Sequence, residues 1–187
     1  MKSPALPLIA ATWLGMTSVC AVAAEPGYLQ FKEEVEAEWK SRAKVLELEI
    51  ETAAPVPMDG KAGAFGYGAL TDGTNNVLVL TAHLPIDDSK YEQAPSGFHT
   101  HVLDLKAPTP DCAGASFEVD LPSSAKNTGF DANYPWSIKG NKIEVDKVPA
   151  ADLGDAGVEN IVSFTIKPIL DAQQQPTHLC VTVVDKI

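Results

Sequence analysis

The sequence predicts a mainly β fold: an antiparallel β-sandwich of Greek-key type, with one amphipathic helix near the N-terminus. About nine short segments carry strand patterns and are separated by turn-forming residues, as is typical of sandwiches and barrels. No helical pattern lies between these segments, which disfavours a parallel sheet with crossover helices. The length of 187 residues, 45% of them hydrophobic, suits one domain with a buried core.

The first residues predict a secretory signal peptide over residues 1–24. Lys2 supplies the positive start, an apolar stretch runs from about Ala5 to Val22, and small residues up to Ala24 form a cleavage pattern. No later apolar segment is long enough to span a bilayer. We therefore expect a periplasmic or extracellular protein that is not held in a membrane after cleavage.

The charge balance excludes some partners. The chain has 25 acidic and 14 basic residues and a formal net charge of −11. Removing residues 1–24 takes away Lys2 and no acid, so the charge becomes about −12. A nucleic-acid partner would need a basic surface, and an anionic substrate would be repelled.

Residues 28–44 predict the amphipathic helix. Phe31, Val35, Trp39 and Ala43 recur every fourth residue and form one apolar stripe. We expect this stripe to pack on the sheet of the same protein. The alternative is a helix that binds a protein partner.

The remaining chain predicts a sandwich domain over residues 45–187, after a signal peptide (1–24) and a helical region (25–44). Alternating or buried apolar patterns predict its strands. The expected strands are residues 45–51, 62–70, 77–83, 98–106, 116–121, 134–139, 142–148, 160–170 and 177–187. Gly140-Asn141 predicts a hairpin turn, and the small residues of the 62–70 segment predict close backbone neighbours.

The cysteines predict a disulfide. Once Cys20 leaves with the signal peptide, Cys112 and Cys180 remain as an even pair in an oxidising compartment. Closing a loop of this length contributes about 4 kcal/mol if the effect is one of chain entropy. The alternative is that the two thiolates bind a metal, which requires reduced cysteines.

The histidines carry the functional hypothesis. His99 and His101 lie two apart on a predicted strand, so their side chains share one face and offer two corners of a copper or zinc site. His83 ends the preceding strand and falls near His99 if the two strands pair. His178, two residues before Cys180, is the fourth histidine of the chain. The alternative is that these residues are surface histidines, with His178 bonded to backbone near the disulfide.

Residues 97–101 (GFHTH) resemble the G-F-H-x-H strand of copper/zinc superoxide dismutases. In that family a cysteine follows about ten residues later and bonds to a cysteine on the final strand. Cys112 and Cys180 match this layout. Chordin-type (CHRD) domains, also β-sandwiches with an H-x-H, are similar as well. The resemblance spans residues 62–187 and implies a superoxide dismutase-like sandwich, although an immunoglobulin-like sandwich also fits the strand pattern.

The sequence departs from the superoxide dismutases where their catalysis resides. No histidine lies between His101 and His178, so the bridging histidine and further zinc ligands are missing. The family's arginine before the last cysteine is replaced, since Thr177, His178 and Leu179 stand there. These departures exclude a two-metal site.

We therefore expect an exported protein that binds copper or zinc through His99 and His101, with His83 and His178 as further ligands, and that does not catalyse a reaction. A second hypothesis is a metal-free binding or assembly module that uses the helix or a sheet edge. The third is a superoxide dismutase-like redox enzyme with a single copper ion.

Overall fold

The computed structural model describes residues 24–40, 44–71, 76–82, 86, 97–155 and 157–187. In these ranges the chain forms ten strands, all paired with antiparallel neighbours, and only short helical turns. The turns are η1 (Gly27–Leu29), η2 (Pro110–Cys112), α1 (Leu121–Ser124) and η3 (Ala150–Leu153). The prediction of a mainly β protein is confirmed. No helix in the described ranges is long and apolar enough to cross a membrane.

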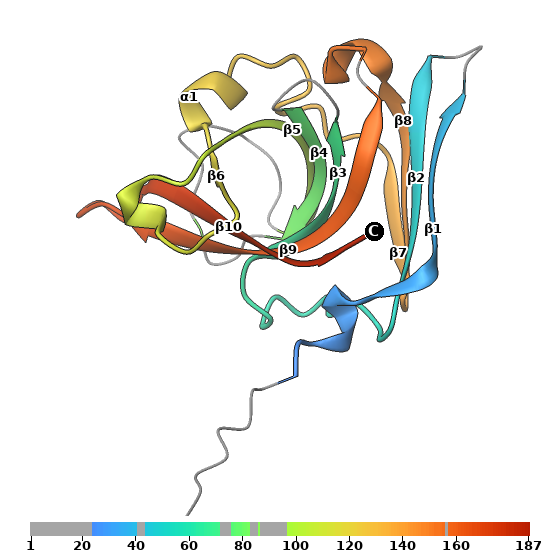
Figure 1. Ribbon diagram of the computed structural model, residues 1–187, viewed down its shortest axis with the longest axis horizontal. Helices are drawn as coiled ribbons and strands as arrows, with labels where there is room; N and C mark the ends of the chain where they lie inside the picture. Colours follow the sequence, from blue (N-terminus) through green and yellow to red (C-terminus); the bar gives the residue numbers. More distant parts are fainter. Residues whose placement is uncertain (1–23, 41–43, 72–75, 83–85, 87–96, 156) are drawn as a thin grey trace, which may run out of the picture.

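One part of the fold is a four-stranded sheet in the order β1-β2-β8-β7. Its strands are β1 (Phe31–Lys40), β2 (Val45–Thr52), β7 (Trp136–Lys139) and β8 (Lys142–Pro149). The sheet stands along one side of the other strands (Figure 1). Gly140, at φ 67°, and Asn141 make the tight turn between β7 and β8, so the predicted hairpin is confirmed.

The other six strands close into a barrel in the order β10-β6-β5-β4-β3-β9. They are β3 (Phe65–Thr71), β4 (Asn76–Ala82), β5 (Phe98–Lys106), β6 (Phe117–Val119), β9 (Val158–Leu170) and β10 (Pro176–Lys186). The predicted β-sandwich is therefore wrong. Alternating strands and turns are common to sandwiches and barrels. Closure depends on two pairings between strands distant in the sequence, β3 with β9 and β6 with β10.

The predicted N-terminal helix is also wrong, because its residues form the edge strand β1. Val35 lies opposite Ile50 of β2, and Trp39 lies opposite Leu46. A spacing of four residues is close to one helical turn but is also an even number, so it places side chains on one face of a strand as well. Pairing with the apolar face of β2 favours the strand over the helix. Ala43, the last residue of the predicted stripe, lies outside the described residues.

The chain just before and at the start of β1 is tied to the barrel. The Ser163 hydroxyl on β9 donates to the carbonyl of Leu29 at 2.5 Å. The amide of Phe31 donates to an Asp185 carboxylate oxygen on β10 at 2.7 Å. Ser163 is fully buried, so its bond satisfies a polar group that would otherwise lack water. These contacts fix where the four-stranded sheet meets the barrel.

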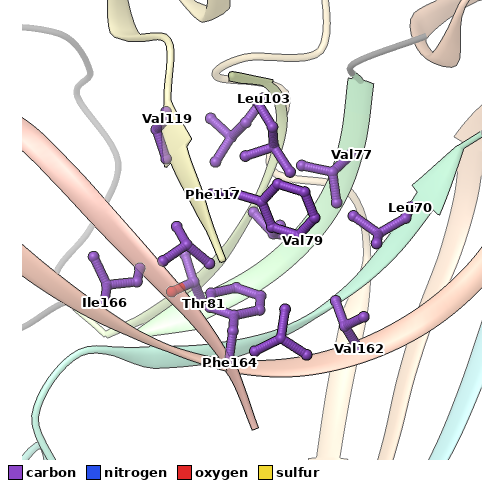
Figure 2. A pocket seen from close by; sticks show the side chains of 13 residues that line it. Leu70, Val77, Val79, Thr81, Leu103, Phe117, Val119, Val162, Phe164 and Ile166 are labelled. Carbon is purple, nitrogen blue, oxygen red and sulfur yellow. The ribbon is translucent and has the colours of Figure 1, made fainter. Parts of the chain in front are cut away.

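The barrel wall separates two apolar cores. On β4, Leu78 and Leu80 point to the four-stranded sheet, whereas Val77 and Val79 point into the barrel (Figure 2). This strand is therefore buried on both faces, which explains its unbroken apolar sequence. The core between sheet and barrel includes Leu46, Leu48, Ile50, Phe65, Tyr67, Phe98, Val102, Ile143 and Val145. The core inside the barrel includes Val77, Val79, Val119, Val162, Phe164 and Val181.

Gly66 on β3 makes room for the interior core. A Cβ atom at this position would lie 2.5 Å from the backbone carbonyl oxygen of Leu80 and 2.8 Å from the Phe164 ring. Real Cβ atoms do not approach so closely, so the barrel can be this narrow only with glycine here. The prediction that this small-residue segment has close backbone neighbours is confirmed.

Candidate metal-binding site

His99 and His101 lie on the inner face of the barrel. On β5 they stand opposite Thr81 and Val79 of β4, and both of these β4 residues line the barrel interior. Both imidazoles are buried, with exposed fractions of 2% for His99 and 4% for His101. Their ring centres are 4.6 Å apart and the ring planes are nearly perpendicular. The strand thus brings this pair together, as the H-x-H spacing predicts.

Backbone carbonyls contact the Nδ1 atom of each ring. The His99 Nδ1 lies 3.1 Å from the carbonyl oxygen of Gly97, and the His101 Nδ1 lies 2.6 Å from that of Phe130. A carbonyl can only accept, so in both neutral rings Nδ1 carries the proton and the lone pair is on Nε2. Metal-binding histidines commonly show this arrangement, because a carbonyl behind the ring fixes the tautomer and orients the ring.

A loop supplies the carbonyl behind His101. Strand β6 reaches only Leu105 and Lys106 of β5. Further along β5, the amide of Val102 instead donates to the carbonyl of Gly129 at 2.9 Å. The loop after α1 therefore continues the hydrogen bonding of β5 and brings the Phe130 carbonyl to His101.

The structure does not bring His178 to this pair. His178 lies on β10 two residues from Cys180, and the alternation of β10 puts both on the outer face of the barrel. Among the described residues, no third His, Cys, Asp or Glu ligand atom lies within 4.8 Å of both His99 and His101. His83 lies outside the described residues. Of the four predicted ligands, the described residues thus place His99 and His101 together and His178 apart from them, and His83 stays a prediction.

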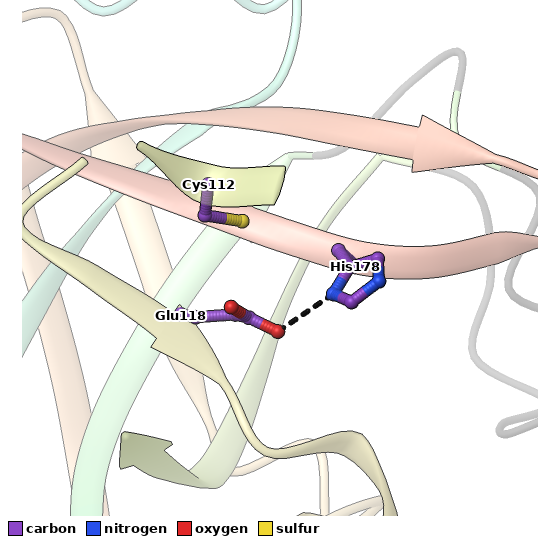
Figure 3. A group of neighbouring side chains, drawn as sticks. All are labelled: Cys112, Glu118 and His178. Atoms are coloured by element: carbon purple, nitrogen blue, oxygen red, sulfur yellow. Dashed lines mark hydrogen bonds and ion pairs between the residues drawn. The ribbon is translucent and has the colours of Figure 1, made fainter. Parts of the chain in front are cut away.

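His178 takes part in a different group, around the buried carboxylate of Glu118 (Figure 3). Its Nδ1 lies 2.8 Å from Glu118 Oε1, and its Nε2 lies 3.5 Å from a carboxylate oxygen of Asp111. Lys106 Nζ is 3.2 Å from the same Glu118 oxygen, and the amide of Thr109 donates to the other at 2.8 Å. The Glu118 carboxylate thus has three polar partners, and only 1% of its side chain is exposed.

These contacts decide the ionisation of Glu118. Burial raises its pKa, but the contacts with His178, the Thr109 amide and Lys106 outweigh burial and bring the pKa down to about 2. The carboxylate is therefore charged at neutral pH and balances nearby positive charge.

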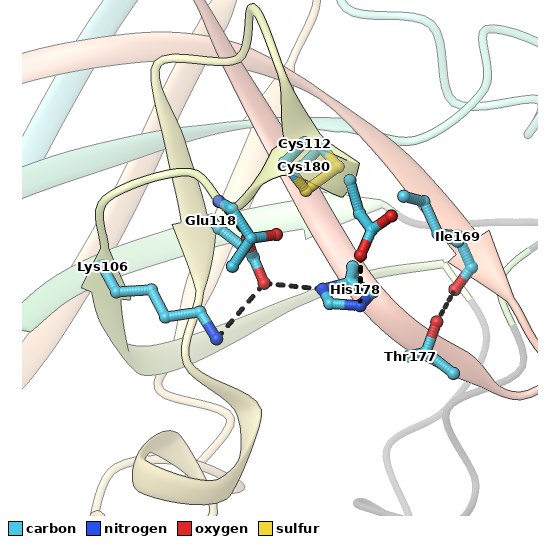
Figure 4. The surroundings of a disulfide bond; sticks show 9 residues. Lys106, Cys112, Glu118, Ile169, Thr177, His178 and Cys180 are labelled. Atoms are coloured by element: carbon cyan, nitrogen blue, oxygen red, sulfur yellow. Dashed lines mark hydrogen bonds and ion pairs between the residues drawn. A yellow bond between two sulfur atoms is a disulfide. The ribbon is translucent and has the colours of Figure 1, made fainter.

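Cys112 and Cys180 form a disulfide beside this group (Figure 4). Their Cα atoms are 5.2 Å apart, and the bond ties η2 to β10. The predicted disulfide is confirmed, and it fits an oxidising environment. Ligand atoms of Cys112, Glu118 and His178 lie within 4.8 Å of one another. With the disulfide intact, the sulfur of Cys112 is not a thiolate and is a poor metal ligand.

The barrel interior offers no space for an organic ligand. The described residues leave a cavity of about 30 Å³, lined by apolar side chains such as Val79, Leu103 and Phe164 (Figure 2). Small-molecule sites are about ten times larger. Described side chains fill the interior that the six strands enclose, so this part of the barrel is a packed core and not a cavity for an organic ligand.

Sequence reasoning missed Glu118 and the Phe130 carbonyl. In the SFEVDL segment, Glu118 alternates with the apolar Phe117 and Val119, a pattern that predicts a solvent-facing carboxylate. It is instead covered by η2 and β10. Only the pairing of β6 with β10 could have indicated this, because it places Glu118 opposite Cys180. A backbone carbonyl supplied by a loop leaves no mark in the sequence.

None of the protein families, characterised proteins or solved structures compared with the chain matches it.

Proposed function

We propose that the protein is an exported metal-binding protein that captures copper or zinc through His99 and His101 without catalysing a reaction. The observation that supports this proposal is the paired imidazole geometry inside the barrel: two buried rings with centres 4.6 Å apart, each with Nδ1 at a backbone carbonyl. Both Nε2 lone pairs are then the ligating positions.

The distances are compatible with one shared ion. Copper and zinc bind imidazole nitrogen at about 2.0–2.1 Å, so one ion holds two nitrogens at most about 4.2 Å apart. Rings 4.6 Å apart can bring their Nε2 atoms into that range. Water would complete the coordination. The net charge of −11 favours the approach of cations.

The proposal extends to location. The signal peptide at residues 1–24 would direct export to a periplasm or to the outside of the cell. The Cys112–Cys180 disulfide supports this, because such bonds persist in oxidising compartments.

Titration with Cu(II) and Zn(II) tests the metal site. We expect one equivalent of metal to bind the chain lacking residues 1–24, and the His99→Ala/His101→Ala variant to lose this binding by about a hundredfold or more, since even outer-shell changes cost 10–100-fold. His178→Ala is the matched control and should bind as the parent does. His83→Ala tests the sequence-based expectation of a further ligand. Equal binding by the parent and the double variant would refute the proposal.

Metal affinity should fall with acidity. Protons compete with the metal for the Nε2 lone pairs, so we expect affinity to drop as pH falls below about 6. Calorimetric titrations between neutral and mildly acidic pH measure this, together with the protons released on binding. Affinity that is constant over this range would show that imidazoles are not the ligands.

The same experiment separates the alternatives. Binding without superoxide turnover supports metal handling, whereas copper-dependent turnover supports the redox enzyme that the superoxide dismutase resemblance suggests. If no metal binds, the buried pair serves to fill the barrel, and a metal-free binding module becomes the better hypothesis.

A further inference from the structure

The surroundings of the disulfide hold the donors of a zinc site once the cysteines are reduced. Cys112, Glu118 and His178 already have ligand atoms within 4.8 Å of one another. Cys180 brings a second sulfur, because it is bonded to Cys112. Two sulfurs, one imidazole nitrogen and one carboxylate oxygen make a donor set that zinc accepts in tetrahedral geometry.

The four side chains come from elements that the fold holds together. His178 and Cys180 are two apart on β10, so both face outward on the same side of that strand. Glu118 lies directly opposite Cys180 on β6. Cys112 ends η2, which Thr109 attaches to Glu118 through its amide at 2.8 Å. Tetrahedral zinc places its ligand atoms about 3.3–3.8 Å apart, so small side-chain movements suffice.

The carboxylate of Glu118 favours a cation, and the half-exposed Lys106, whose Nζ lies 3.2 Å from Oε1, would turn to solvent as a metal enters. Glu118 is an ionised carboxylate with 1% of its side chain exposed, and its Oε1 faces the Nδ1 of His178 at 2.8 Å. A metal ion can take the place of the proton between these two atoms. Asp111, whose carboxylate lies 3.5 Å from the other nitrogen of His178, would orient the imidazole as an outer-shell partner.

We propose that in the reduced chain Cys112, Glu118, His178 and Cys180 bind one zinc ion, and that this ion and the disulfide are alternative ways of joining η2 to β10. A newly made chain carries thiols, so zinc would bind before the disulfide forms. Binding converts two thiols into thiolates and releases two protons to solvent. A disulfide-bearing oxidant then takes two electrons from the thiolates and two protons from solvent and is reduced to two thiols, while the Cys112–Cys180 bond forms and zinc leaves.

The experiment uses the His99→Ala/His101→Ala background, so that metal on the other site does not contribute. The chain is reduced with a phosphine, desalted without oxygen and titrated with Zn(II) against a chromophoric chelator. Co(II) replaces zinc in a parallel sample, because thiolate ligation gives charge-transfer absorption. We expect one equivalent of metal with thiolate absorption in the reduced chain and none in the oxidised chain.

Variants assign the ligands. His178→Ala and Glu118→Gln should each lower zinc affinity at least about tenfold, whereas the matched exposed-sheet variant Glu144→Gln should leave it unchanged. If reduction unfolds the chain, zinc should restore the β-sheet circular dichroism spectrum, because binding free energy becomes folding free energy. Failure of the reduced chain to bind or refold overturns the proposal. Binding that does not depend on His178 and Glu118 overturns it as well, because loose thiolates would then suffice.

Discussion

Two buried threonines differ in whether the side-chain hydroxyl has a hydrogen-bond partner. Thr81 and Thr100 are both buried, on neighbouring strands. The Thr81 hydroxyl donates to the carbonyl of Phe65 at 2.9 Å. The Thr100 hydroxyl has no hydrogen-bond partner among the described residues. A buried polar group without a partner destabilises the folded state, whereas a bonded one contributes modestly.

Replacing each threonine by valine should therefore give opposite results. We expect Thr100→Val to leave the free energy of unfolding unchanged or to raise it by up to about 1 kcal/mol. Thr81→Val should lower it by about 1 kcal/mol, because the Phe65 carbonyl loses its donor. Denaturant unfolding of the two variants measures the difference. Equal losses at both positions would contradict this prediction.

Glu118 makes the free energy of unfolding depend on pH in the acid range. Its pKa in the folded state is about 2, below the ordinary value of 4.5. A carboxylate with a lowered folded pKa stabilises the fold above its unfolded pKa, and this contribution is lost as pH falls through the folded pKa. The contribution is therefore full above about pH 4.5 and disappears toward about pH 2.

We expect Glu118→Gln to unfold more easily at neutral pH, by about 3 kcal/mol, because His178 and Lys106 lose a buried charged partner. Its stability should also change less than that of the parent between about pH 4.5 and 2. Denaturant unfolding at a series of pH values measures both effects. Glu159→Gln, at an exposed position of β9, is the control, and parallel pH curves for the parent and Glu118→Gln would contradict the prediction.

At the scale of elements, strand positions were predictable and strand partners were not. The nine predicted strands are present with ends shifted by a few residues, because alternation and turn residues are local signals. The helix over residues 28–44 failed because its four-residue spacing suits strands too, and only contact with β2 resolves the choice. Segments with a clear hydrophobic period were thus assigned to the correct secondary structure, except where the spacing fits both a helix and a strand.

The outer face of the four-stranded sheet contains a row of like charges. Glu36 lies directly opposite Glu49, and Glu49 lies directly opposite Glu144. Glu38 and Glu47 are also opposite each other, but Lys40 pairs with both. Like charges directly across strands destabilise a sheet. Lys139 lies 3.9 Å from Glu144, a longer contact than those that Lys40 makes with Glu38 and Glu47, so the row through Glu49 is less well compensated.

Glu49→Lys should therefore raise the free energy of unfolding by about 0.5–1 kcal/mol at low salt, because each repulsive neighbour becomes an attractive one. The matched variant Glu47→Lys should bring no gain, since it places a second cation beside Lys40. Thermal unfolding at low and high salt checks both, and the gain should shrink as salt rises. A gain of equal size in both variants would contradict the prediction.

At the scale of the whole molecule, the candidate site was predictable only in part. The His99–His101 pair follows from strand alternation alone, as does the shared face of His178 and Cys180. The sequence cannot tell which face of the barrel wall each pair occupies, because that depends on closure through β3–β9 and β6–β10. The wall places His99 and His101 inside and His178 outside, so His178 does not join the pair.

The bond between the Phe31 amide and Asp185 shows that the start of β1 and the end of β10 are neighbours. Because these two ends are close together, the chain can be joined there and opened elsewhere without changing how the strands pair. A circular permutant that joins Ile187 to residue 25 by a short glycine linker, and opens the exposed turn at residue 173 between β9 and β10, should fold and keep the disulfide. Circular dichroism and a free-thiol assay test this, and an unfolded permutant would show that the chain must begin its folding with β1.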